Sequence, residues 1–199
     1  MANANRPSGL SPVKHLITGA FNGQGNIYSI AAGDTNGYAI GDPVASSGTA
    51  DANGVAGITL ATAGTGNAIR GVILGLGTSE SGIFNPNNLN STVRPAAAQS
   101  TAWYAIVADD PNIIFEVQEV GTGTALAATD VGNNANLASG TNNGYQSGWQ
   151  LSNAGLATTN TLQVRILGLS RRSDNAYGYY AKWLVKINNH ELAAGTAGV

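Results

Sequence analysis

Cysteine is absent from this 199-residue chain. Its absence excludes a disulfide framework, a zinc–thiolate site and a thiol nucleophile, and it fits a reducing cytoplasm. Long hydrophobic runs are absent as well, since no stretch approaches the ~20 consecutive apolar residues that a membrane-spanning helix needs. The N-terminus also lacks the apolar segment of a signal peptide. The sequence therefore predicts a soluble protein with no membrane partner that is not secreted through a cleaved signal.

Charged residues are scarce. Only 10% of the chain is Asp, Glu, Lys or Arg, against about 25% in ordinary globular proteins. The net charge is −2, and the one basic doublet, Arg171-Arg172, is too small for a nucleic-acid-binding stripe, so no nucleic-acid partner is expected. A polar, weakly charged surface suits a protein that lies against a partner. It suits equally well an isolated β-protein with Gly/Asn-rich loops, so composition leaves both interpretations open.

Residues for catalysis or metal binding are also few. The only histidines are His15 and His190, and no G-x-S-x-G nucleophile motif occurs. His190-Glu191 begins like a zinc-protease helix, but position 194 is alanine where the second histidine would stand. Asp51-Ala52-Asn53-Gly54 resembles the start of a calcium loop without its later ligands, so a turn is expected there. The sequence predicts a non-enzymatic protein with no catalytic residues, no metal site and no cofactor.

The chain does contain many short runs with a period of two. Residues 182–187 set Trp183, Val185 and Ile187 on one face, which is typical of a half-buried strand. Two similar runs, 103–107 and 113–117, flank a turn at Asp110-Pro111 and predict an antiparallel hairpin. Further strands are expected at 26–30, 38–45, 55–61, 68–76 and 162–167, with a short one around 149–151, while long loops are expected elsewhere between 121 and 160.

These regularly spaced strands indicate an all-β fold, a jelly-roll/β-sandwich or a barrel-like body, and no amphipathic helix of three turns is apparent. We expect residues 21–199 to form this single β-rich body with Gly/Asn-rich loops. Residues 1–20 fall outside the pattern and predict an extended N-terminal arm. Pro7 and Pro12 oppose a helix or central strand there, and Arg6, Lys14 and His15 make the arm basic.

An aromatic cluster lies near the C-terminus, at Tyr177, Tyr179, Tyr180 and Trp183. Aromatic side chains with a polar tip supply large contact areas, so the cluster predicts either a protein-interface hot spot or a platform on which a sugar stacks. Trp183 is expected in the core instead, because it alternates with Val185 and Ile187.

Several segments in order along the chain resemble a group of tailed-phage virion proteins, the capsid cement or head decoration proteins. The resemblance covers nearly the whole chain and rests on ANRPSGLSPV, GDPVASSGTADANGVAGITLA followed by IRGVILG, YAIVADDPNIIFEVQE, ATDVGNNANL, and RILGLSRRSDNAYGYYAKWLVKINNHELAAGTAGV.

The resemblance implies a bacteriophage structural protein, made in the host cytoplasm, that binds the outer surface of the capsid in the virion. Its implied partners are the major capsid protein and further copies of itself, as a homodimer or homotrimer. It would clamp neighbouring capsid subunits by binding alone, without catalysing a reaction. The residues expected to bind the capsid or a neighbouring subunit are Arg6, Pro7, Pro12, Lys14, His15, Arg171, Arg172, Tyr177, Tyr179 and Tyr180. The alternative is a virion-surface carbohydrate-binding or host-attachment module that uses the tyrosines.

Overall fold

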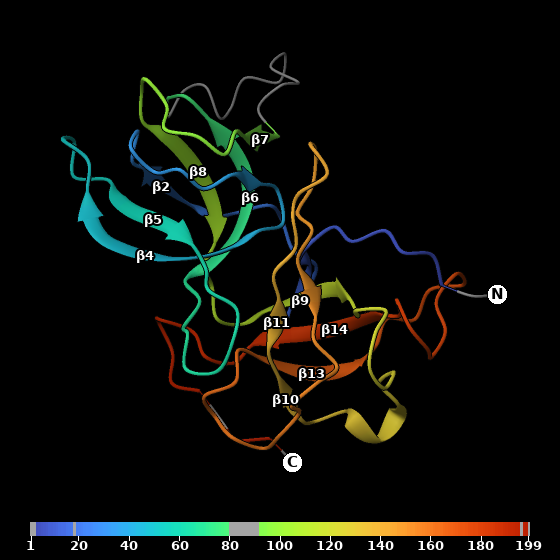
Figure 1. Ribbon diagram of the computed structural model, residues 1–199. Coiled ribbons are helices and arrows are strands. Elements are labelled where there is room, and N and C mark those ends of the chain that lie inside the picture. Colours follow the sequence, from blue (N-terminus) through green and yellow to red (C-terminus); the bar gives the residue numbers. More distant parts are fainter. Residues whose placement is uncertain (1–2, 18, 80–91, 196, 199) are drawn as a thin grey trace.

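The computed structural model describes residues 3–17, 19–79, 92–195 and 197–198, and within them the protein is all-β (Figure 1). It has two five-stranded sheets, one of them closed into a ring, and two small two-stranded sheets, an arrangement consistent with a β-sandwich. In the described residues the single helical segment is one 3₁₀ turn, Ala128–Asp130. No helix there is long and apolar enough to cross a membrane.

The open sheet has the strand order β1-β9-β14-β13-β10, and the ring has the order β2-β5-β4-β6-β8. The open sheet consists of β1 (Ser11–His15), β9 (Ile113–Gln118), β14 (Lys182–Ile187), β13 (Val164–Leu169) and β10 (Asn134–Ala135). The ring consists of β2 (Asn26–Ile30), β5 (Ala56–Leu60), β4 (Pro43–Ala50), β6 (Gly71–Gly77) and β8 (Trp103–Ala108). The small sheets pair β3 (Tyr38–Ala39) with β7 (Val93–Arg94), and β11 (Leu137–Ala138) with β12 (Gln150–Leu151).

The period-two pattern determines which side chains enter the core. In β14, Trp183, Val185 and Ile187 are buried while the residues between them are partly exposed. They join a core cluster under the open sheet that also contains Phe115 and Trp149. A second cluster, with Tyr28, Ile30 and Ile73, fills the ring. Val72 and Ala108 of the ring strands belong to the first cluster, so the two sheets share core residues.

The predicted hairpin of residues 103–117 is wrong in its pairing, although both strands and the turn between them exist. Strand β8 pairs with β2 and β6 in the ring, whereas β9 pairs with β1 and β14 in the open sheet. Both edges of each strand therefore pair with segments that are distant in sequence, so β8 and β9 do not pair with each other. The turn, closed by a hydrogen bond from the Ile113 N–H to the Asp110 carbonyl, is the corner at which the chain passes from one sheet to the other.

The N-terminal segment also differs from the expected arm of residues 1–20. Residues 11–15 form β1, the edge strand of the open sheet, and Leu10 just before it is 1% exposed. Pro12 fits this position because an edge strand can spare one backbone N–H, and the pairing register shifts directly after it. The described residues before Ser11 belong to no strand.

Candidate functional site

The N-terminal segment lies beside the open sheet, where residues 3–6 contact the loop of residues 170–181 that precedes β14, which we call the tyrosine loop (Figure 1). The Asn3 amide group donates to the carbonyl oxygens of Ala176 and Tyr179 at 2.8 and 3.0 Å, and its oxygen accepts the Ala176 N–H at 3.1 Å. Because the Asn3 side chain both donates to and accepts from the backbone of the loop, these hydrogen bonds form in only one relative position of the two segments. The contact therefore fixes the N-terminal segment on the tyrosine-containing loop.

The side chain of Gln118, the last residue of β9, forms hydrogen bonds with the same two segments. Its Nε2 donates to the carbonyls of Ala4 and Tyr180 at 2.8 and 3.1 Å, and its Oε1 accepts the Arg6 N–H at 3.0 Å. The side chain is 3% exposed. A buried amide with its hydrogen-bonding groups satisfied orients its partners firmly. Sequence reasoning missed Gln118, because a glutamine at a strand end looks the same whether it faces solvent or the interior.

Glu119, the next residue, is a second polar group that sequence reasoning missed. It is fully buried and accepts the Leu126 N–H at 2.8 Å, the Trp183 indole N–H at 3.0 Å and the Asn153 amide at 3.1 Å. These three donors lie on β14 and on two loops that follow β9. Through these hydrogen bonds Glu119 connects β14 and the two loops to the end of β9, next to Gln118, which bonds residues 3–6 and the tyrosine loop.

We call the hollow between these segments the terminal groove. Its volume is about 280 Å³, and it is lined by Asn3, Ala4, Arg6, Gln118, Arg172, Asp174, Asn175, Tyr180 and Lys182. Three predicted site residues, Arg6, Arg172 and Tyr180, thus come together although Arg6 lies more than 160 positions before the other two in sequence.

The charges of the terminal groove are partly paired. Arg172 bridges Glu116 at 3.0 Å and Asp174 at 3.1 Å. The hydrogen bond from Arg172 lowers the pKa of Asp174 below its ordinary value, and the pKa of Arg172 is raised in turn, first by Asp174 and then by Glu116. Arg6 is exposed, and no acidic side chain among the described residues lies within ion-pair distance of it. Arg6 is therefore the cation of the groove that is available to a partner's carboxylate.

The tyrosines beside the groove have different roles. Tyr177 and Tyr179 are 54% and 45% exposed. The Tyr179 hydroxyl donates to the Gly123 carbonyl at 2.5 Å, and the Tyr177 ring lies 5.8 Å from that of Trp183, which is fully buried as expected. Tyr180 is held in place, because its ring occupies the space where Gly121 lacks a Cβ, and its φ of 62° is one that non-glycine residues seldom adopt.

The other predicted site residues lie away from the groove. Lys14 and His15 are at the end of β1 that is farther from the groove. His15 pairs there with Ile113, the first residue of β9, whereas Gln118 at the groove is the last. Pro12 lies nearer the start of β1. Pro7 is partly buried, and Arg171 is exposed next to Arg172. The structure thus places five of the ten predicted residues in or beside the groove and three along β1, while Pro7 and Arg171 belong to neither group.

His15 lines a separate open hollow of about 410 Å³ with Asp109 and Asp110. Its Nδ1 lies 3.2 Å from an Asp110 oxygen. Asp109 is buried and committed to other groups, accepting the Tyr28 hydroxyl at 2.6 Å and the Asn26 amide at 2.9 Å. The described residues of this hollow include no serine, threonine or lysine that could act as a nucleophile. In the described part of the chain no group of three or more His, Asp or Glu residues is placed to hold a metal ion.

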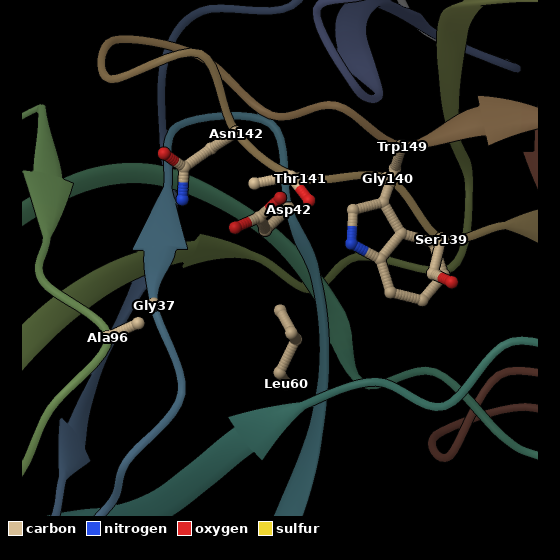
Figure 2. Close-up of a pocket in the computed structure, with 9 residues that line it drawn as sticks. All are labelled: Gly37, Asp42, Leu60, Ala96, Ser139, Gly140, Thr141, Asn142 and Trp149. Carbon is tan, nitrogen blue, oxygen red and sulfur yellow. The ribbon is translucent and has the colours of Figure 1, made fainter.

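A further cavity lies on the ring, under the loop of residues 139–149 (Figure 2). This loop connects β11 to β12, the two strands of a small sheet, and its Ser147 N–H donates to the Ile40 carbonyl at 3.0 Å. Asp42, Leu60 and Trp149 line the cavity, and none of them was singled out as a site residue from the sequence.

Comparison of the chain with known protein families, with curated proteins and with solved structures finds no match.

Proposed function

We propose that this protein is a capsid cement protein of a tailed phage, a non-enzymatic structural protein that binds the outside of the head and clamps neighbouring major capsid proteins. One observation carries the proposal. The N-terminal segment and the tyrosine loop, which both belong to the segments that resemble the cement family, are fixed to each other in one groove. We extend the same proposal to the fold, as a jelly-roll variant of the β-sandwich.

The exposed groups at the groove suit protein binding. Arg6 offers a guanidinium to a carboxylate, and Tyr177 and Tyr179 offer apolar area with polar tips. Arginine and tyrosine are the side chains that most often dominate interface energies. Since each contact of this kind is modest, repeated copies on a shell gain affinity through effective concentration.

The test is to add purified protein to phage heads that lack it and to measure occupancy and the temperature at which the heads release DNA. We expect the wild-type protein to decorate the heads and to raise that temperature. The double substitution Arg6→Ala with Tyr177→Ala should weaken head binding by about tenfold or more. Tyr145→Ala is the control for the tyrosine, because Tyr145 is 72% exposed and lies in the loop of residues 139–149, not in the loop that contains Tyr177.

Two results would contradict the proposal. One is that heads with and without the protein release DNA at the same temperature. The other is that the Tyr145 control binds as weakly as the groove variant, which would leave the groove without a special role.

A second candidate function is carbohydrate or host-receptor binding by Tyr177 and Tyr179, whose neighbouring exposed rings favour it. A glycan array separates the two candidates, since a cement protein should show no sugar preference. Specific binding that is lost in Tyr177→Ala would support the attachment module instead.

A further inference from the structure

The cavity on the ring has a volume of about 340 Å³, at the small end of the range for ligand pockets, roughly 300–1,000 Å³. Its lining combines an apolar wall, one carboxylate and a polar rim. The lining residues are Gly37, Asp42, Leu60, Ala96, Ser139, Gly140, Thr141, Asn142 and Trp149. Figure 2 shows the Asp42 carboxylate, the Leu60 side chain and the Trp149 indole around the same space.

Asp42 is the unusual member of this lining. It is 3% exposed, and no Lys, Arg or His side chain in the described chain lies within ion-pair distance of it. Its Oδ2 accepts the Ala39 N–H at 2.7 Å, and Ser147 supplies a further hydrogen bond. Burial raises its pKa to about 6, and these hydrogen bonds offset only part of that effect.

A structural role does not account for the negative charge. The turn of residues 39–42 needs an acceptor for the Ala39 N–H, and an asparagine oxygen would serve without the cost of burying an ion. A buried carboxylate becomes favourable when a cation pairs with it. In the described lining Asp42 is the sole charged residue, so the cation has to come from a ligand.

The geometry also limits what kind of cation fits. The Ala39 N–H and Ser147 already occupy two of the roughly four lone-pair sites of the carboxylate, which disfavours a bidentate guanidinium against an ammonium, which needs one site. Leu60 and Trp149 provide apolar contacts for a hydrocarbon stem, and an indole also attracts a cation. The rim of Ser139, Thr141 and Asn142 is polar but uncharged.

We propose that this cavity binds a primary alkylammonium group, namely the side chain of a lysine of a partner protein, with Asp42 as its counter-ion. The stem lies against Leu60 and Trp149, and the neutral backbone of the lysine remains at the rim. A free diamine shares the same chemistry, but its second ammonium finds no acid in the described lining. The inference is independent of the proposed function, since a lysine can come from a capsid protein or from another partner.

The test is an NMR titration of the full chain with Nα-acetyl-lysine N-methylamide, observing the indole N–H signals of the three tryptophans. Trp149→Phe identifies the signal of interest. We expect that signal to shift saturably with the lysine probe, to shift less with 1,4-diaminobutane, and not to shift with the uncharged norleucine analogue. Asp42→Asn should weaken lysine binding by about tenfold, while retaining the turn. Asp51→Asn, another turn-capping aspartate, is the matched control and should bind as the wild type does.

The proposal is overturned if the norleucine analogue binds as well as the lysine probe, or if a folded Asp42→Asn protein binds unchanged. Tighter binding of 1,4-diaminobutane would contradict the lysine as the occupant. If Asp42→Asn does not fold, the wild-type protein still decides the matter. Lysine binding should weaken as the pH falls below about 6, where Asp42 becomes protonated, and binding that is constant from pH 7 to pH 5 would exclude Asp42 as the counter-ion.

Discussion

Asp42 shows what a single buried charge does to the stability of this protein. Its ordinary pKa is 3.8, and burial raises the pKa in the folded chain to about 6. The folded state therefore binds a proton more tightly than the unfolded state does. Between these two pH values the unfolded chain carries fewer protons on this group, so the free energy of unfolding falls as the pH rises. The other described residues of the cavity are uncharged and do not titrate with it.

We expect the stability difference between the wild type and Asp42→Asn to depend on pH in this direction. The wild type should lose about 2–3 kcal/mol relative to the variant as the pH rises from about 4 to about 7. Urea unfolding of both proteins at several pH values measures the difference and cancels the titration of all other groups. A difference that does not change over this interval would show that Asp42 titrates normally in the folded state.

Residue-level prediction from the sequence worked where a local pattern is sufficient. Trp183 is buried because it alternates with two aliphatic residues, and Asp51 caps a turn through hydrogen bonds to the N–H groups of Asn53 and Val55. Prediction failed for Gln118 and Glu119, which bond residues distant in sequence, and for Asp42, which bonds Ser147 as well as its neighbour Ala39. A polar residue next to a strand gives no local sign of whether its partner is water or a remote backbone group.

At the scale of elements, β1 connects the N-terminal segment to the body. It covers one edge of β9, and Leu10 anchors its start in the core. Residues 3–6 add hydrogen bonds to Gln118 and to the tyrosine loop but bury little apolar area. Two deletions of different length therefore separate binding from folding.

Deleting residues 2–7 should cost about 1–2 kcal/mol of stability, because it removes a few partly exposed hydrogen bonds. Deleting residues 2–14 should cost about 3–5 kcal/mol, because it also removes Leu10 and most of β1 and exposes the edge of β9. Thermal unfolding and size-exclusion chromatography check both results. Equal stability of the two truncated proteins would mean that β1 contributes nothing to the body.

The strands themselves were largely predictable, since their period-two patterns are strong, and residues 26–30 and 182–187 match β2 and β14. Their pairing was not. The region 38–45 divides into β3 and β4 because the chain turns at Gly41, whose φ is +92°. The strands on either side of Pro111, β8 and β9, enter different sheets. Each pairs with strands that are distant in sequence and not with the other.

At the scale of the whole molecule, a weakly charged surface and a few exposed apolar side chains favour self-association. Val13, Leu16 and Ile17 are 43%, 49% and 82% exposed; Val13 lies in β1, and Leu16 and Ile17 directly follow its last residue. This location is separate from the terminal groove, so a contact between copies there leaves the groove free for another partner. Such an arrangement would suit the homodimer or homotrimer that the resemblance to cement proteins implies.

We expect light scattering to give two or three times the chain mass of 20.1 kDa at micromolar concentration. Substituting both Leu16 and Ile17 by serine should reduce the mass to that of one chain without loss of stability, since these side chains are largely exposed. A wild-type mass of one chain would contradict the oligomer, and an unchanged oligomer in the double variant would place the contact elsewhere.

The order of strands in the open sheet has a consequence for synthesis of the protein. Strand β1 cannot pair until β9 has been made, and β9 has its second neighbour only when β14 emerges, close to the C-terminus. Sheets built from such distant segments fold slowly and late. The terminal groove combines residues 3–6 with residues 172–182 and therefore exists only after residue 182 has been made. A nascent chain that has not reached residue 182 has no groove with which to bind a partner prematurely.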